Sequence, residues 1–189
     1  PLPVAVLGAG RMGRHHARIY HELPEARLVG VVDPDQERAH TLADRHNTDA
    51  YDDMAELLAA HPELAAVSIA APTEHHVSIA GPLLERGIAC LVEKPIAPTV
   101  EEAQALSQRA EQEGTVLRVG HTERFNPAVR AVAAMDITPR FIEIDRVSPM
   151  AFRSLDVSVV MDMMIHDLDI VLMLMGAPLK HVDAAGIAV

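Results

Sequence analysis

The sequence is poor in cysteine and in basic residues, and each shortage excludes a class of protein. Cys90 is the only cysteine, so no disulfide can form within the chain, which fits a reducing cytoplasm. Cys90 also falls in an apolar run predicted to be a buried strand, and we therefore interpret it as a core residue rather than a nucleophile. Lysine and arginine total 16 against 27 acidic residues, which gives a net charge of −11. Nucleic acid is not expected as the main partner, because binding to phosphates needs a basic surface.

The chain also lacks low-complexity tracts, a basic leader and a long uncharged apolar run. Hydrophobic residues make up 49% and charged residues 23%, a composition typical of an ordered globular protein. The first residues lead straight into an apolar run with no basic segment of the kind that begins a signal peptide, so we expect a cytoplasmic protein. The window most similar to a membrane span, residues 157–176, contains Asp162, Asp167 and Asp169. Each aspartate would cost about 2.5–3.5 kcal/mol at a bilayer centre, so no membrane partner is expected.

Apolar runs of strand length alternate with helical patterns along the first 120 residues. The predicted strands are residues 4–8, 27–32, 66–70, 88–92 and 115–119, and the predicted helices are residues 11–23, 36–46, 74–86 and 100–113. Strands composed almost wholly of Val, Ile, Leu and Ala are typical of a parallel sheet covered by helices on both faces. The pattern therefore predicts an α/β fold with a Rossmann-type, doubly wound parallel sheet over residues 1–120.

The pattern changes after Gly120, where we place the start of a second domain that spans residues 121–189. Residues 140–147 alternate polar with apolar side chains, which predicts a strand of a mixed or antiparallel sheet with one wet face. One helix and a last strand-like run, residues 181–189, accompany it. Two strands and one helix are too few to bury their own apolar face. We therefore expect the start of an open α+β domain that is completed by a further segment or by another chain.

A glycine-rich turn follows the first predicted strand and opens the first predicted helix. It consists of Gly8, Ala9, Gly10, Arg11, Met12 and Gly13. In such a turn the backbone can approach a pyrophosphate, while the helix N-terminus supplies N–H groups. Asp33 ends the second strand 20 residues after Gly13, where a carboxylate can accept hydrogen bonds from an adenosine ribose and would repel a 2′-phosphate. The combination predicts NAD rather than NADP; the alternative is a tight strand-to-helix turn with a helix-capping aspartate.

Two further segments end predicted strands at the carboxyl edge of the sheet, where open α/β sheets bind ligands. Ala71, Pro72 and Thr73 form the first, although a Pro-Thr pair is equally a helix N-terminal signal that would leave His75 and His76 as solvated first-turn residues.

The second segment, Glu93, Lys94 and Pro95, places an ionisable pair directly after a buried run, which packing does not readily explain. Pro95 restricts the residue before it, and its peptide bond is a candidate for the cis form. Lys94 beside a nicotinamide ring would suit proton exchange with a substrate hydroxyl. The alternative is a surface Glu–Lys pair at a strand end.

A predicted helix over residues 159–175 carries Asp162, His166 and Asp169 at positions i, i+4 and i+7, and therefore on one face. Most of the remaining surface of this helix is apolar and is formed by Met161, Met164, Ile165, Leu168, Val171, Leu172 and Met175. A polar stripe on a buried helix should face a cavity or a partner. The alternatives are a capped helix end with a core histidine and a metal site, but no second group of ligands is evident and we expect no metal.

With these residues, the sequence resembles the Gfo/Idh/MocA oxidoreductase family along essentially all 189 residues. The family's glycine-rich turn matches residues 8–13, and its Thr-Pro-Asn-x-x-His-like segment matches residues 71–76, with Ala and Thr substituted. Its Glu-Lys-Pro matches residues 93–95, and its Asp-x-x-x-His matches Asp162 and His166. Residues 120–127 and 156–169 resemble, more narrowly, the subgroup similar to UDP-N-acetylglucosamine 3-dehydrogenases, also labelled MviM-like. Members of the family usually continue beyond this length to complete a large open sheet.

The resemblance implies an enzyme: an NAD-dependent dehydrogenase that acts on a CH–OH group of a sugar or of a nucleotide sugar similar to UDP-N-acetylglucosamine. Lys94 and His166 would bracket the substrate hydroxyl, His166 would accept its proton, and Asp162 would orient the sugar or the imidazole. The cofactor would contact the glycine-rich turn and Asp33, together with Ala71, Pro72, Thr73, His76, Glu93 and Lys94. The candidates for substrate contacts are Arg124, Asn126 and Arg153, and the two arginines suit a nucleotide-sugar phosphate. The alternative is that all three are surface residues on loops.

Three other functions remain compatible with the sequence. A different sugar or polyol dehydrogenase of the same family is the nearest of them. A related NAD-using glycosidase would give no net change in NADH. A binding-only chain would hold NAD without turnover. In each case we expect a homo-oligomer that forms through the sheet of the second domain.

Overall fold

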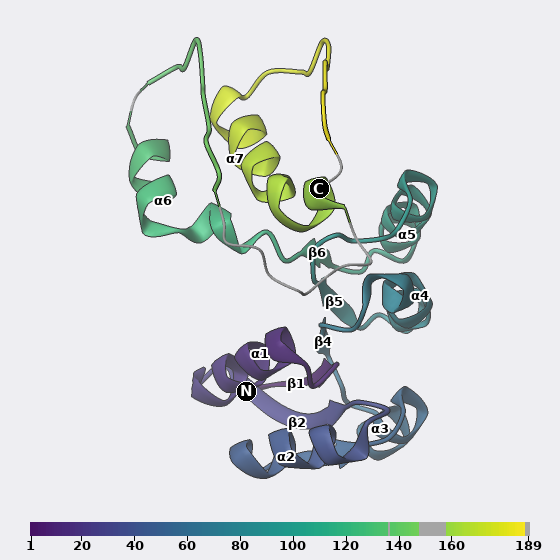
Figure 1. The fold of residues 1–189 in the computed structure, drawn as a ribbon. Helices are drawn as coiled ribbons and strands as arrows, with labels where there is room; N and C mark the ends of the chain where they lie inside the picture. Colours follow the sequence, from purple (N-terminus) through teal and green to yellow (C-terminus); the bar gives the residue numbers. More distant parts are fainter. Residues whose placement is uncertain (136, 148–157, 188–189) are drawn as a thin grey trace. The chain divides into compact units, whose positions relative to one another are not determined.

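The structure is a computed structural model and describes residues 1–135, 137–147 and 158–187. The chain divides into two compact units, Pro1–Gly120 and His121–Val189. Figure 1 draws both units as a ribbon coloured along the sequence. All strands of the described residues belong to the first unit.

The first unit is a parallel six-stranded sheet (Figure 1). Its strands are β1 (Leu2–Leu7), β2 (Ala26–Val32), β3 (Asp49–Tyr51), β4 (Ala66–Ile69), β5 (Ala89–Val92) and β6 (Leu117–Val119). They lie in the order β3-β2-β1-β4-β5-β6, and each neighbouring pair is parallel. The chain order reverses between β1 and β4, and doubly wound sheets bind ligands beyond the carboxyl ends of the strands at such a reversal. The predicted Rossmann-type fold class is confirmed.

Alternate residues of the strands contribute to two separate cores. The helices α1 (Arg11–Glu22) and α2 (Gln36–His46) cover one face of the sheet. The other face is covered by α3 (Met54–Ala60), α4 (His76–Glu85) and α5 (Val100–Glu113). On β1, Ala5 and Leu7 pack under α3, α4 and α5, whereas Val6 between them packs under α1 and α2. This period of two is the reason that the strands are apolar on both faces.

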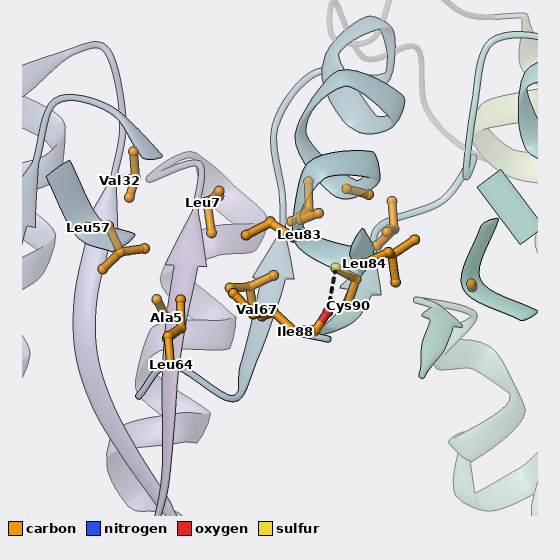
Figure 2. Close-up of a cluster of buried hydrophobic side chains, with 14 of the residues drawn as sticks. Ala5, Leu7, Val32, Leu57, Leu64, Val67, Leu83, Leu84, Ile88 and Cys90 are labelled. Atoms are coloured by element: carbon orange, nitrogen blue, oxygen red, sulfur yellow. Dashed lines mark hydrogen bonds between the residues drawn. The ribbon is translucent and has the colours of Figure 1, made fainter. Parts of the chain in front are cut away.

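Figure 2 shows part of the larger core, in which Leu83 and Leu84 of α4 lie beside Cys90 of β5. Cys90 is buried, as predicted, and burial raises the pKa of its thiol to about 12. A thiol with so high a pKa is not ionised at neutral pH and is a poor nucleophile. Cys90 is therefore a core residue.

Most elements of the first unit match the predicted ranges within a few residues. Two were not predicted, β3 and α3, since β3 is only three residues long and α3 only seven. The predicted helix over residues 74–86 begins instead as a short 3-10 turn, η1 (Thr73–His75), before α4.

The second unit is helical in its described residues. It contains a 3-10 turn η2 (Thr122–Phe125), α6 (Pro127–Ala133), a π-helical turn η3 (Val160–Met164) and α7 (Ile165–Met175). The predicted strands were wrong here, since none of residues 140–147 and 181–187 belongs to a strand. Figure 1 draws both segments, in green and yellow, as coil. A strand needs the backbone of a neighbour for its hydrogen bonds, and the described residues of this unit offer no such neighbour.

The predicted helix over residues 159–175 is present but is buried differently from the prediction. It begins as the π-helical turn η3, so α-helical spacing does not hold throughout. Its buried side chains are Asp167 and Asp169, whereas Val159, Leu168 and Leu172 are exposed. Although this helix overlaps the most apolar window of the sequence, no helix of the described chain is both long and apolar enough to cross a bilayer.

We expect the 189-residue chain to self-associate. Phe141 is 80% exposed and Val147 95% exposed, and large exposed apolar surface promotes association. Light scattering coupled to size-exclusion chromatography should give a mass that rises with protein concentration. Phe141→Asp combined with Val147→Asp should reduce this rise, whereas Val100→Asp, at a 67% exposed position on α5, should leave it unchanged. A monomer at every concentration would contradict the expectation.

Candidate active site

The turn after β1 is closed at its first and third glycines and open at its second. Gly8 has a φ of +103°, and a Cβ at this position would lie 2.5 Å from the carbonyl oxygen of Ala70. A Cβ on Gly13 would lie 1.7 Å from the carbonyl oxygen of Gly8. A Cβ on Gly10, by contrast, would have no described atom within 4 Å. The second glycine thus presents bare backbone to space that a ligand can enter, which is what a pyrophosphate requires.

The helix α1 begins directly behind this open glycine. Gly10 is its N-cap, and no side chain of the described residues caps the N-terminus through a hydrogen bond. Arg11, which is exposed, and Met12, which is half-buried, occupy the first two helical positions. A helix N-terminus carries about half a positive charge, and its first N–H groups have no partner inside the helix. The turn therefore fits the pyrophosphate of a dinucleotide.

Asp33, at the end of β2, is buried and connects β2 to the glycine-rich turn. Its Oδ2 accepts a hydrogen bond from the Ala9 N–H at 2.7 Å. Its Oδ1 accepts hydrogen bonds from the Asp35 N–H at 2.9 Å and from Nη2 of Arg38 at 3.2 Å. An ionised carboxylate offers about four lone-pair positions, so these three donors leave room for one more, such as a ribose hydroxyl.

A surface cavity beside Asp33 has charged lining residues of both signs, which are Arg14, Asp35, Glu37, Arg38 and Arg45. Arg38 pairs with Asp33 at 3.2 Å and with Asp35 at 2.9 Å. The charge of Arg38 is therefore offset by these two carboxylates. A pocket for a 2′-phosphate needs an arginine available for the phosphate, and here Arg38 is committed to two carboxylates.

His76 joins the segments that follow β4 and β5. It is buried, with Nδ1 2.9 Å from the carbonyl oxygen of Pro95 and Nε2 2.9 Å from that of Ala71. A solvated first-turn position therefore describes His75, which is exposed, but not His76. The Lys94–Pro95 peptide is cis. Because β4 and β5 are neighbours, residues 71–73 and 93–95 lie together at the carboxyl edge of the sheet.

Glu93 and Lys94 differ in burial although they are adjacent. The Glu93 carboxylate is buried, and its Oε1 lies 2.9 Å from Nε2 of His16. A Cβ on Gly120 would lie 3.0 Å from the same oxygen, so the carboxylate packs closely against the chain after β6. Lys94 is half-buried. A surface pair at a strand end therefore does not describe Glu93.

His16 and its neighbours are not among the site residues predicted from the sequence. Nδ1 of His16 lies 3.1 Å from Oγ of Ser68, and that oxygen lies 2.7 Å from Oη of Tyr20. Two signals pointed to these residues: a histidine in the first helix shortly after the glycine-rich turn, and a serine within the apolar strand β4. Neither signal indicates a contact with Glu93 without the fold.

In the second unit, arginines bind both buried aspartates of α7. Nε and Nη2 of Arg124 each donate to Asp169 at 2.6 Å. Arg146 donates to Asp167 in the same two-pronged way, at 2.7 and 2.6 Å. Such bidentate pairs are the strongest hydrogen-bonded ion pairs in proteins. They connect α7 to the η2 turn and to the segment of residues 137–147.

The predicted polar stripe of this helix contains residues in different environments. Asp162 and His166 are half-buried, whereas Asp169 is buried. Burial alone would raise the pKa of the Asp169 carboxyl, but hydrogen bonds from Arg124, with nearby positive charge that includes His166, hold that pKa below its ordinary value. Asp169 is therefore an ionised partner of Arg124, and His166 lies within electrostatic reach of it.

The predicted substrate residues have structural roles of their own where they are described. Asn126 begins α6, since its Oδ1 accepts the Ala128 N–H at 3.0 Å. Arg124 pairs with Asp169, and Arg153 lies outside the described residues. Substrate contacts of these three residues stay a prediction. Within the described ranges, no group of three or more His, Cys, Asp or Glu side chains is arranged to hold a metal ion.

Known proteins resemble this chain along nearly its whole length. A UDP-N-acetylglucosamine 3-dehydrogenase from Acidithiobacillus ferrooxidans is 40% identical over 184 residues, which are 97% of this chain and 57% of that protein. A crystal form of a dehydrogenase of that name and organism has a TM-score of 0.91 and 40% identity, with 100% of this chain and 61% of that chain covered. A scyllo-inositol 2-dehydrogenase (NAD(+)) from Bacillus subtilis is 31% identical over 192 residues, which are 96% of this chain and 56% of that protein.

A more distant structure, GenD2 from gentamicin A biosynthesis in complex with NAD, has a TM-score of 0.67 and 32% identity, with 70% of this chain and 38% of that chain covered. The chain thus spans less than two thirds of the length of each of these relatives. The sequence profile of the Gfo/Idh/MocA oxidoreductase family, described by its NAD-binding Rossmann fold, matches residues 2–121. Because this match covers more than half of the chain, the protein belongs to the Gfo/Idh/MocA family of oxidoreductases with an NAD-binding Rossmann fold.

Proposed function

We propose that residues 1–120 are the NAD-binding domain, and residues 121–189 the first part of the substrate domain, of a dehydrogenase that oxidises a CH–OH group of a sugar. The observation that carries the proposal is the hydrogen bond from the Ala9 N–H to Asp33 at 2.7 Å, because it joins the pyrophosphate turn to the ribose-binding carboxylate. A nucleotide sugar similar to UDP-N-acetylglucosamine is the proposed substrate class. Its support is the 40% identity with a UDP-N-acetylglucosamine 3-dehydrogenase along 97% of this chain.

In the proposed cofactor site, backbone N–H groups behind Gly10 bind the pyrophosphate, and Asp33 accepts a hydrogen bond from the ribose. The segments at the ends of β4 and β5 contribute Ala71, Pro72, Thr73, Glu93 and Lys94, and His76 holds the two segments together. The nicotinamide, when bound, supplies the hydride acceptor. The protein would then only have to orient the sugar and remove one proton.

We assign the removal of that proton to His166 and Lys94, the ionisable side chains that match the catalytic positions of the family. Imidazole is a suitable general base near neutral pH. Lys94 would exchange the proton or hydrogen-bond the hydroxyl, and Asp162 would orient the sugar or the imidazole. The carboxylate of Asp169 lies within electrostatic reach of His166.

We expect NAD to bind at least about tenfold more tightly than NADP, a difference of about 1.4 kcal/mol. The physical reason is the negative charge of Asp33, which accepts hydrogen bonds from ribose and repels a 2′-phosphate. Calorimetric titration of both cofactors into the chain measures the difference, and Asp33→Asn should narrow it. Equal affinities, or tighter binding of NADP, would mean that Asp33 does not bind the ribose.

Turnover assays with the full-length gene product distinguish the proposed function from its rivals. Production of NADH with UDP-N-acetylglucosamine supports it, whereas turnover with inositols alone would favour a polyol dehydrogenase like the relative from Bacillus subtilis. Sugar release without net NADH would indicate a glycosidase. Cofactor binding without turnover on any sugar would leave a binding-only protein. A cytoplasmic location and a homo-oligomer are part of the proposal.

A further inference from the structure

Four polar side chains form a continuous hydrogen-bonded chain beneath α1, on the face of the sheet that α1 covers. Tyr20 and His16 come from α1, where they are four residues apart and therefore on one side of the helix. Ser68 comes from β4, and Glu93 follows β5. The links measure 2.7 Å from Tyr20 to Ser68, 3.1 Å from Ser68 to His16 and 2.9 Å from His16 to Glu93.

The donors and acceptors of these four side chains can have only one order when Glu93 is ionised and His16 is neutral. A carboxylate only accepts, so Nε2 of His16 must carry the hydrogen. A neutral imidazole then has Nδ1 as an acceptor, and Ser68 must donate to it. Tyr20 must donate to Ser68 in turn. Burial raises the pKa of the Tyr20 phenol above its ordinary value, which outweighs the hydrogen bond with Ser68 and keeps the phenol protonated as a donor.

The row of hydrogen-bonded side chains ends at Glu93, which belongs to the predicted cofactor and catalytic segment, rather than in the middle of the core. Ser68 and Glu93 are buried, and burial of polar groups is costly unless each is hydrogen-bonded. Val67 and Ile69, on either side of Ser68 in β4, pack in the apolar core on the opposite face. Packing alone would favour an apolar residue in place of Ser68. A row of hydrogen-bonded polar side chains at this place is explained if it serves to hold the carboxylate of Glu93 in one orientation.

We propose that His16 is a positioning residue, which holds the ionised carboxylate of Glu93 in one orientation at the carboxyl end of β5, directly before Lys94. Ser68 and Tyr20 fix the tautomer of the imidazole. The carboxylate also lies near Gly120, where an added Cβ would be 3.0 Å from its Oε1. Lys94 therefore directly follows a residue, Glu93, whose side chain is held in place. The catalytic consequence rests on the proposed function, because it requires Lys94 to act on the substrate.

Nitrogen NMR of the histidine side chains in the 189-residue chain tests the anchoring without substrate or cofactor. His16 should be protonated at Nε2 and not at Nδ1, and Ser68→Ala or Glu93→Gln should each change this signature. His15 is exposed next to His16 on α1, and its signals should not respond. A His16 protonated at Nδ1, or one that is insensitive to both variants, would overturn the proposal.

Kinetics of the full-length enzyme test the consequence for catalysis. His16→Ala should lower kcat by about 10- to 100-fold, the cost of a catalytic group displaced by roughly 1 Å, while KM for NAD changes less than about threefold. His16→Gln, whose amide can still donate to Glu93, should recover at least half of the lost kcat on a logarithmic scale. His15→Ala is the matched control and should keep the normal kcat.

The two experiments separate the failure of this inference from the failure of the proposed function. Normal kcat in His16→Ala, or no recovery in His16→Gln although that variant is folded, would refute positioning. If the NMR signature holds and the enzyme turns over no sugar, the proposed function is wrong, and the anchoring of Glu93 stands.

Discussion

Replacement of Lys94 by Met, or of His166 by Ala, is expected to lower kcat of the full-length enzyme by about 10²–10⁴, the range for a positioned acid–base group. The affinity for NAD should change little, because neither the pyrophosphate turn nor Asp33 is altered. Steady-state kinetics with a sugar substrate, together with titration of NAD, measure both quantities. A loss of kcat without a loss of NAD binding assigns the residue to the chemical step.

The double variant tests whether the two residues serve one proton transfer. If they do, Lys94→Met combined with His166→Ala should lose much less than the product of the two single effects. Asp162→Asn should be milder than either, because an orienting residue leaves the base in place. Leu172→Ala is a suitable control, since Leu172 lies on the same helix and is exposed. Near-normal turnover in His166→Ala would make the polar stripe of the helix structural.

The first unit could be predicted from the sequence because its local signals agree with its tertiary structure. The bounds of α2 and α5 were predicted to the residue. Asp35 and Thr99 cap the two N-termini through side-chain hydrogen bonds, and Asn47 and Gly114 end the helices in the left-handed conformation. The segment that contains β3 and α3 was missed, although Asp53 caps α3 in a similar way, because a three-residue strand has no detectable periodicity.

The second unit could not be predicted from local patterns, because a pattern of polar and apolar residues does not show which other segment those residues contact. The alternation over residues 140–147 is present in the sequence, but Phe141 and Val147 are exposed and the segment is not a strand. Arg146, a polar residue of the predicted strand, pairs instead with Asp167 of α7. Opposite charges 21 residues apart give no pattern that identifies them as partners.

The predicted site also contains local features, which the sequence indicates directly, and non-local features, which depend on the fold. The glycine-rich turn, Asp33 and the Glu-Lys-Pro segment follow directly from positions at strand ends. The direct hydrogen bond from Ala9 to Asp33 depends on β1 and β2 being adjacent and parallel. The burial of His76 between two carbonyl groups was not expected, since sequence alone treats a histidine in a first helical turn as solvated.

A single methyl group is expected to have different effects at the third and at the second glycine of the glycine-rich turn. Gly13→Ala should lower the free energy of unfolding of the first unit by about 3 kcal/mol or more, beyond the usual cost of overpacking. The new Cβ would lie 1.7 Å from the carbonyl oxygen of Gly8. That oxygen belongs to the backbone of the turn, so relief of the clash requires α1 to move away from β1. Urea unfolding followed by circular dichroism measures the loss.

Gly10→Ala is the matched variant, because the same methyl group meets no described atom within 4 Å and the backbone there has φ of −69°. The free energy of unfolding should stay within about 0.5 kcal/mol or rise slightly, since alanine restricts the unfolded chain. The affinity for NAD should nevertheless fall by about tenfold or more, which is about 1.4 kcal/mol, because the methyl group occupies the space through which the pyrophosphate reaches the helix N-terminus. Unchanged NAD affinity in Gly10→Ala would mean that the phosphates do not contact this turn. A folded Gly13→Ala with wild-type stability would contradict the close approach of α1 to β1 on which the proposed cofactor site depends.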